Sequence, residues 1–243
     1  GRGEYDEAAR ALEQAVRGGS EREFLVEARY WQAETLYRLG RIEQADWLFR
    51  QVAQDAPRGD LGVFALHGSG FTALDLRDAA RARDVFTRLL AGPVPAPIEP
   101  WARHGLALAH YLLGRHEEAH RIWAALSTRP AQAALGRDLL FWMGESLGRV
   151  GQHGRAAEEL KRFVGGGAHP LLDTARLRYA WWSLAAGRAA DSVAAFRALG
   201  TVPRGGSPAA LGAAERDWVD AGLALALAAG GERQGARDAA RPL

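Results

Sequence analysis

Cysteine and asparagine are absent from this sequence, and Lys161 is its only lysine. Without cysteine the chain has no disulfides, no thiolate metal ligands and no cysteine nucleophile. A run of 18 apolar residues is also lacking, so we expect no membrane insertion within this segment. Scarce lysine and asparagine beside abundant alanine, arginine and glycine indicate a GC-rich bacterial genome.

The chain has almost no excess of one charge. It carries 31 basic and 29 acidic residues, which gives a net charge of +2 at pH 7. Nucleic-acid binding needs a concentrated basic face, and so small an excess does not favour one. We therefore predict no nucleic-acid partner. The hydrophobic fraction of 48% is enough for a continuous core.

One spacing recurs along the chain. Gly3, Gly40, Gly114 and Gly151 lie on a 37-residue period, and Arg77 occupies the remaining position. Each of them is followed five residues later by an alanine and nine residues later by a bulky residue. The alanines are Ala8, Ala45, Ala82, Ala119 and Ala156, and the bulky residues are Leu12, Phe49, Phe86, Trp123 and Leu160. A fixed period of this length is typical of a repeat solenoid.

Each period reads as two helices. In residues 28–39 the apolar side chains recur at intervals of three and four, which indicates an amphipathic helix. Gly40 ends that helix, a second one is predicted over residues 42–54, and Pro57 prevents its continuation. The unit is therefore a helix, a glycine turn, a second helix and a proline.

These units predict an all-α solenoid that occupies residues 1–243 as one domain. Residues 1–19 supply only the second helix of a truncated repeat, and residues 209–243 form an irregular C-terminal repeat. Five full repeats are predicted between them, at residues 25–57, 61–93, 99–130, 135–167 and 171–200. Because the sequence opens within a repeat and no signal peptide precedes it, we expect a fragment of a longer protein.

The repeat resembles the tetratricopeptide repeat family. When the turn glycine is numbered 15, that family has small residues at positions 8 and 20 and a bulky residue at position 24. Position 8 is here always alanine or glycine, as in Ala33, Gly70 and Ala107, and position 20 is alanine except at Ser192. The period is 37 rather than 34 residues, which is similar to variants in bacterial envelope proteins. The resemblance thus favours the periplasm or envelope over the cytoplasm.

The resemblance also implies where a partner binds. In this family the first helix of each pair lines the concave side of a right-handed superhelix. The corresponding residues here are Tyr30, Glu34, Tyr37, Arg38, Phe64, His67, Phe71, Asp75, Trp101, His104, Leu108, Tyr111, Phe141, Glu145, Arg149, Leu177 and Trp181. Aromatic and arginine side chains are enriched in binding hot spots, but aromatics also dominate cores. Either role is open for each of these residues.

The segment His116–His120 matches the H-E-x-x-H pattern of zinc metalloproteases. Two histidines four residues apart on a helix can bind zinc, and Glu145 could supply a third ligand. The repeat accounts for the same letters, because Ala119 is its small position and His116 stands where an aromatic is expected. We therefore predict no metal site, with His116 and His120 as the only candidates.

Our prediction from the sequence is a non-enzymatic scaffold that binds a protein or peptide and needs no cofactor. Two alternatives remain open. The first is a structural array that spaces other domains or self-associates end to end through its apolar terminal faces. The second is a zinc metalloprotease that uses the His116–His120 segment.

Overall fold

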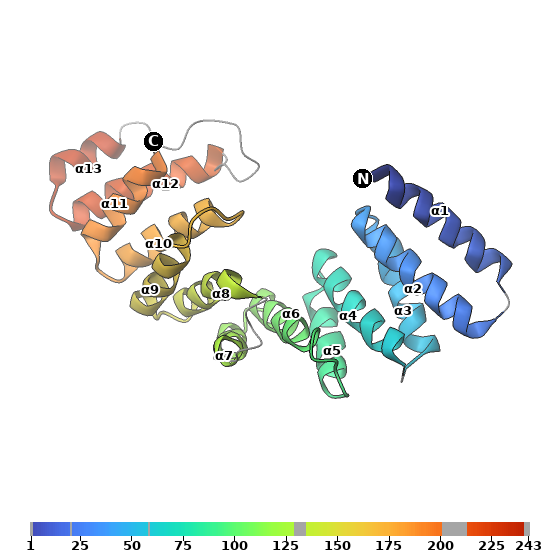
Figure 1. Cartoon of the computed structure of the whole chain (residues 1–243). Helices are drawn as coiled ribbons and strands as arrows, with labels where there is room; N and C mark the ends of the chain where they lie inside the picture. The colour runs from blue at the N-terminus through green and yellow to red at the C-terminus, as the bar shows by residue number, and fades with distance from the viewer. Residues whose placement is uncertain (1, 20, 58, 129–134, 201–212, 241–243) are drawn as a thin grey trace. The chain divides into compact units, whose positions relative to one another are not determined.

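The computed structural model describes residues 2–19, 21–57, 59–128, 135–200 and 213–240. In these ranges the chain forms thirteen α-helices and no β-strand, which confirms the predicted all-α class (Figure 1). The helices are α1 (Arg2–Gly18), α2 (Arg22–Arg38), α3 (Ile42–Asp55), α4 (Asp60–Asp75), α5 (Ala79–Leu90), α6 (Glu99–Leu112), α7 (His116–Ser127), α8 (Gly136–Arg149), α9 (His153–Val164), α10 (Leu172–Ala185), α11 (Ala189–Gly200), α12 (Ala213–Ala229) and α13 (Arg233–Ala240). No helix in the described ranges has the length and apolarity needed to cross a bilayer.

The helices fall into two compact units. Unit 1 is Gly1–Ala131 with α1 to α7, and unit 2 is Gln132–Leu243 with α8 to α13. One array over residues 1–243 therefore stays a prediction. The parts of the predicted repeats at residues 129–130, 209–212 and 241–243 lie outside the described ranges.

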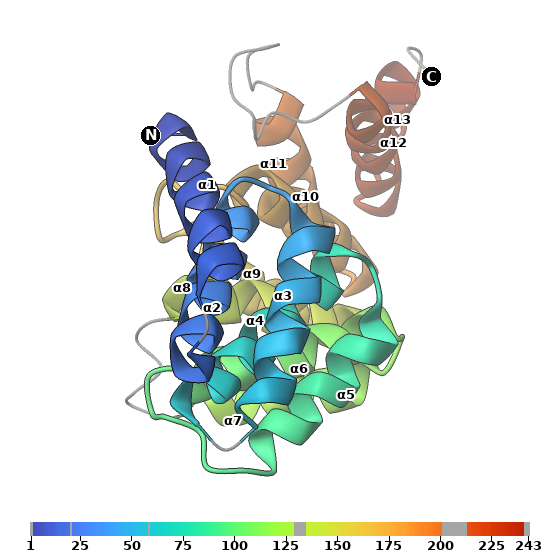
Figure 2. The ribbon, with the colours of Figure 1, turned by 90° about the vertical axis from the view of Figure 1, so that its right-hand side faces the viewer.

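Within each unit the helices alternate between two layers. Each helix packs against the next one of the same unit, as α1, α2 and α3 do at one end of unit 1 (Figure 2). In addition, α4 contacts both α2 and α6, and α10 contacts both α8 and α12. We call these six the first helices, because each is the first of its pair. The second helices are α3, α5, α7, α9, α11 and α13, together with the unpaired α1.

The turn inside each pair is closed by the same two hydrogen bonds. After α2 the Gly40 N–H donates to the Tyr37 carbonyl and the Arg41 N–H to the Leu36 carbonyl. This is the Schellman motif, which needs a left-handed residue at the position of Gly40, where φ is 77°. Both bonds and a positive φ recur at Gly114, Gly151, Gly187 and Gly231.

Arg77 makes this turn without being glycine. Its φ is 61°, and among the described residues it alone combines a side chain with a positive φ. A left-handed conformation costs a residue with a Cβ roughly 1–2 kcal/mol. The next residue compensates in part, since the Asp78 carboxylate accepts a hydrogen bond from the Arg81 N–H and caps α5. Such a cap contributes about 1 kcal/mol.

The small and bulky positions of the repeat form the core. Their alanines in α3, α5, α7 and α9 have no exposed surface, and Phe49, Phe86, Trp123 and Leu160 are at most 1% exposed. Phe86 shows how closely these layers pack. A Cβ added at Gly70 or Gly105 would lie 2.5 or 2.3 Å from the Phe86 ring. Larger residues at either glycine would overfill the core.

Helix α1 departs from this pattern. Its Ala8 and Leu12 are half-buried, whereas Ala9 is only 7% exposed. Among the described residues α1 packs chiefly against α2, and the side of α1 that carries Ala8 and Leu12 is partly open.

Candidate functional site

All the predicted binding residues lie on first helices, as their positions in the repeat require. We define the first-helix face of unit 1 by the predicted residues of α2, α4 and α6, and that of unit 2 by those of α8 and α10. The exposed members are Arg38, Asp75, Trp101 and Arg149. The half-buried members are Tyr30, Glu34, Tyr37, Phe64, His67, Phe71, Leu108, Tyr111 and Trp181, and the buried ones are His104, Phe141, Glu145 and Leu177. The buried four contribute to packing rather than to a surface.

Polar contacts join the C-terminal ends of α2 and α4. The Tyr37 hydroxyl donates to the Asp75 carboxylate at 2.8 Å. Burial, followed by this hydrogen bond, raises the pKa of Tyr37 well above its usual value. One turn earlier, Glu34 lies 3.2 Å from Arg38 and accepts from the Tyr30 hydroxyl at 3.5 Å. Burial and the charge of Glu34 raise the pKa of Tyr30 to about 12. Both phenols therefore remain protonated donors at neutral pH.

The aromatic residues of this face have one edge in the core. Tyr30 packs against Phe49 with ring centroids 6.0 Å apart, and Phe71 packs edge-on against Phe86 at 5.2 Å. Tyr111 is likewise 6.1 Å from Trp123. In these three pairs a bulky residue of a second helix packs against an aromatic ring of the first helix. This packing holds the first-helix ring in place. Such rings offer binding area at little entropic cost.

Two histidines of the same face are desolvated. His104 is buried, and its Nδ1 accepts a hydrogen bond from Trp123 Nε1 at 3.0 Å. The buried Nε2 atom of His67 has no hydrogen-bond partner. Burial lowers the pKa of both imidazoles to about 4. Both are therefore neutral at pH 7, and neither presents a cation to a partner.

The first-helix face of unit 2 has a different chemistry. Glu145 is 4% exposed and lies 3.3 Å from Arg178 Nε, and Trp182 Nε1 donates to it at 3.4 Å. Trp181 packs edge-on against Trp218 of α12 with centroids 5.8 Å apart. Trp218 is 59% exposed.

The sequence prediction missed the contribution of α12. Trp218 is 59% exposed and Leu225 is 55% exposed. They occupy first-helix positions 2 and 9 of the last repeat. Those are the positions of Trp101 and Leu108 in α6. Counting positions back from Gly231, the turn glycine of the last pair, would have found them.

The H-E-x-x-H segment is part of α7. The His116 ring lies 4.9 Å from the Tyr111 ring, His120 is half-buried, and Ala119 is fully buried in the core. Among the described residues, no three histidine or acidic side chains gather closely enough to hold a metal ion. His116 and Ala119 therefore make packing contacts with neighbouring residues of the repeat.

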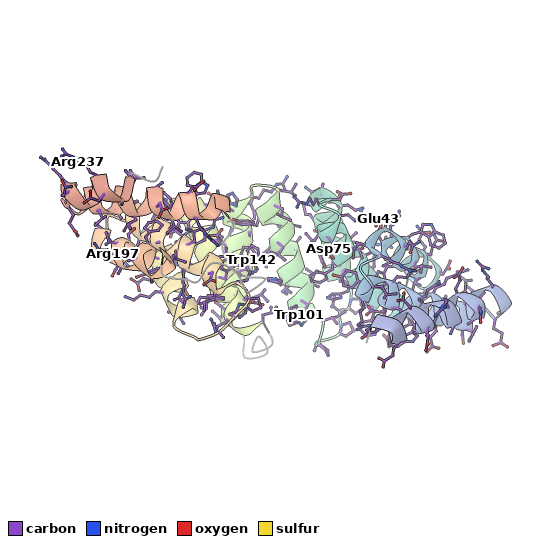
Figure 3. The ribbon with its side chains drawn as sticks, turned by 90° about the horizontal axis from the view of Figure 1, so that it is seen from above. Glu43, Asp75, Trp101, Trp142, Arg197 and Arg237 are labelled. Carbon is purple, nitrogen blue, oxygen red and sulfur yellow. The ribbon has the colours of Figure 1, made fainter. Side chains whose placement is uncertain are left out.

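A groove of about 890 Å³ lies among α1, α2 and α3, on the side away from the first-helix face. One period later, Asp46 of α3 and Arg81 of α5 close the equivalent space with hydrogen bonds of 2.8 and 3.0 Å. The residues that correspond to them in the groove are Ala9 and Gln44. Ala9 and Gln44 cannot form such an ion pair. Glu43, labelled in Figure 3, is one of the residues that line the groove.

These features define the chain as an α-helical repeat protein. Residues 27–58, which span most of α2 and all of α3, match the family model described as tetratricopeptide repeat. The resemblance to the tetratricopeptide repeat family is thus confirmed for these residues. No curated protein is significantly similar to it in sequence.

Solved structures share the fold at low sequence identity. BtubC of P. vanneervenii is 17% identical with a TM-score of 0.60, over 84% of this chain and 93% of that one. PilW, titled a widely conserved type IV pilus biogenesis factor, is 18% identical with a TM-score of 0.59, over 82% and 93%. PlcR of Bacillus thuringiensis, solved with the peptide PapR7 and DNA, is 18% identical with a TM-score of 0.51, over 68% and 65%.

Proposed function

We propose that this chain is a scaffold that binds a protein or peptide through the first-helix faces of its two units. Tetratricopeptide-repeat proteins are generally non-enzymatic interaction scaffolds. The observation that carries the proposal is the set of ordered, partly exposed aromatics at equivalent first-helix positions, above all Trp101 and Trp218. Of the neighbours in fold, PlcR was solved with a peptide. A role in bacterial envelope assembly remains a prediction from the sequence resemblance.

Trp101→Ala and Trp218→Ala test this proposal, and Trp47→Ala is their matched control. Trp47 is 54% exposed but lies on α3, a second helix. We expect proteins captured from the source lysate by the wild-type chain to be depleted with the first two variants and retained with the third. Quantitative mass spectrometry of the captured proteins measures this. Equal recovery with all four baits would remove the support for the first-helix faces.

Self-association is the competing hypothesis, and α1 favours it, because Ala8 and Leu12 of this helix are only half-buried. Light scattering over a range of protein concentrations separates the two. If the chain polymerises end to end, its measured molar mass rises with protein concentration. Leu12→Glu in α1 would then abolish this rise. A binding scaffold has the same mass with and without that substitution.

A further inference from the structure

We propose that the first-helix face of unit 1 binds a cationic segment, that is, a stretch of partner protein in which arginine or lysine accompanies apolar residues. This inference rests on the proposed function and names the chemistry of the partner. It depends on charge complementarity and on the rings that lie beside the charges. The charges and the rings both belong to residues of α2, α4 and α6, within a single unit.

The charged side chains of this face are mostly acidic. To the predicted residues of this face we add Glu27, which occupies repeat position 2 in α2. The face then holds the carboxylates of Glu27, Glu34 and Asp75 and one guanidinium, that of Arg38. Glu27 stands one period before Phe64, and both Glu27 and Asp75 are exposed. Arg38 compensates Glu34 at 3.2 Å. The face therefore has an excess of two negative charges, in a chain whose overall net charge is +2.

The hydrogen bonding around Asp75 orients its carboxylate without neutralising it. Its partner is the hydroxyl of Tyr37, a neutral donor, which bonds to Oδ2 at 2.8 Å. After burial and the Asp75 hydrogen bond, the charges of Asp75 and Glu34 also raise the pKa of Tyr37, so negative charge gathers near this hydroxyl. A guanidinium or ammonium group that enters here would meet a preoriented carboxylate at the end of α4, where Asp75 projects (Figure 3).

The aromatic residues of the same face suit a cation as well. Tyr30 and Phe64, on adjacent first helices, have ring centroids 6.4 Å apart, and Trp101 is 37% exposed on α6. The face of an aromatic ring attracts a cation by roughly 0.5–2 kcal/mol, most strongly for tryptophan. Carboxylates and ring faces thus favour the same sign of ligand charge. An acidic peptide would be repelled by Glu27 and Asp75 and could pair only with Arg38.

Three short labelled peptides test the inference with the full chain, by fluorescence anisotropy. They share the same apolar residues, and their variable positions hold arginine, glutamine or glutamate. The variant is Glu34→Gln with Asp75→Asn, which keeps the shape of both side chains. The matched control is Glu43→Gln with Glu117→Gln, which removes two exposed carboxylates from the second helices α3 and α7. Circular dichroism checks that all of these proteins are equally folded.

We expect the arginine peptide to bind with the lowest Kd, and added salt to raise that Kd. In the Glu34 and Asp75 variant the Kd should rise about tenfold, whereas the control should match the wild type. Equal or tighter binding of the glutamine or glutamate peptide would overturn the cation preference and leave peptide binding intact. An equal rise in the variant and the control would also overturn it, because the effect would then be one of net charge. Binding of none of the three would overturn it too, while the Trp101 capture experiment tests the proposed function independently.

Discussion

Units 1 and 2 are built by the same packing rule but present different first-helix faces. In unit 1, Phe86 of a second helix fits against Gly105 of the following first helix, where a Cβ would lie 2.3 Å from the ring. In unit 2, Phe196 fits against Gly222 in the same way, with a Cβ distance of 2.2 Å. Counted from the turn residue of each helix pair, the two phenylalanines hold one repeat position and the two glycines another. The repeat position therefore sets how helices pack in both units.

The faces themselves do not follow the period. At repeat positions 12 and 13, α2 and α4 of unit 1 carry Tyr37 and Asp75, joined by a hydrogen bond, whereas α10 and α12 of unit 2 carry Leu184 and Ala229. An exposed position tolerates many residue types because no neighbouring helix restricts it. Two faces of one protein can thus diverge while the cores beneath them stay alike. If each face binds a partner, we expect partners of different chemistry.

Ala119→Trp in unit 1 and Ala156→Trp in unit 2 should have the largest effects, and they test the shared packing rule. Both alanines have no exposed surface at the small position of a second helix. An indole cannot fit between helices there, so each change should lower the free energy of unfolding by about 3 kcal/mol. Thermal melts and limited proteolysis measure the loss and locate it in the substituted unit. Ala→Ser at the same positions is the control, and a tryptophan variant that melts like the wild type would contradict the assigned register.

Acid should distinguish the two units. The pKa values of His67 and His104 in unit 1 are lowered to about 4 from a usual value of 6.5. Between these values the unfolded chain binds protons that the folded chain does not, so stability is lost as the pH falls from about 6.5 to about 4. For His104, protonation of Nδ1 also breaks the hydrogen bond from Trp123. We expect a loss of about 2 kcal/mol for each histidine.

Urea unfolding at several pH values between 7 and 4.5 measures this loss. In His67→Phe the pH dependence of the free energy of unfolding should be weaker, because the titrating imidazole is gone. The buried Nε2 atom has no hydrogen-bond partner, so the substitution breaks no hydrogen bond of that atom. The matched control is His153→Phe in unit 2, where the imidazole stacks on Trp182 and a phenyl ring can do the same. If His67→Phe keeps the full pH dependence of the wild type, the desolvation of His67 is not its cause.

The sequence predicted the packing of the chain better than its surface. The spacing singles out Ala45, Ala119 and Phe86, and all three are buried, because a buried position in a repeat restricts residue size in every copy. The predicted binding set was mixed, and His104 and Glu145 proved to be buried. Their burial depends on single contacts with Trp123 and with Arg178 and Trp182. Such contacts do not recur with the period, so the spacing could not reveal them.

The smallest predicted effects concern the turns, where unit 1 breaks the rule that unit 2 keeps. Arg77→Gly should stabilise the chain by about 0.5–1 kcal/mol. The substitution removes the cost of a left-handed conformation for a residue with a Cβ. Glycine also raises the entropy of the unfolded chain, which offsets part of this gain. Gly151→Ala, at the same turn position of unit 2 where φ is 82°, should destabilise by about 1 kcal/mol. Urea unfolding of both variants measures the two values. A destabilised Arg77→Gly variant would show that the Arg77 side chain contributes contacts worth more than the strain of its backbone, and that this turn is held differently from the glycine turns.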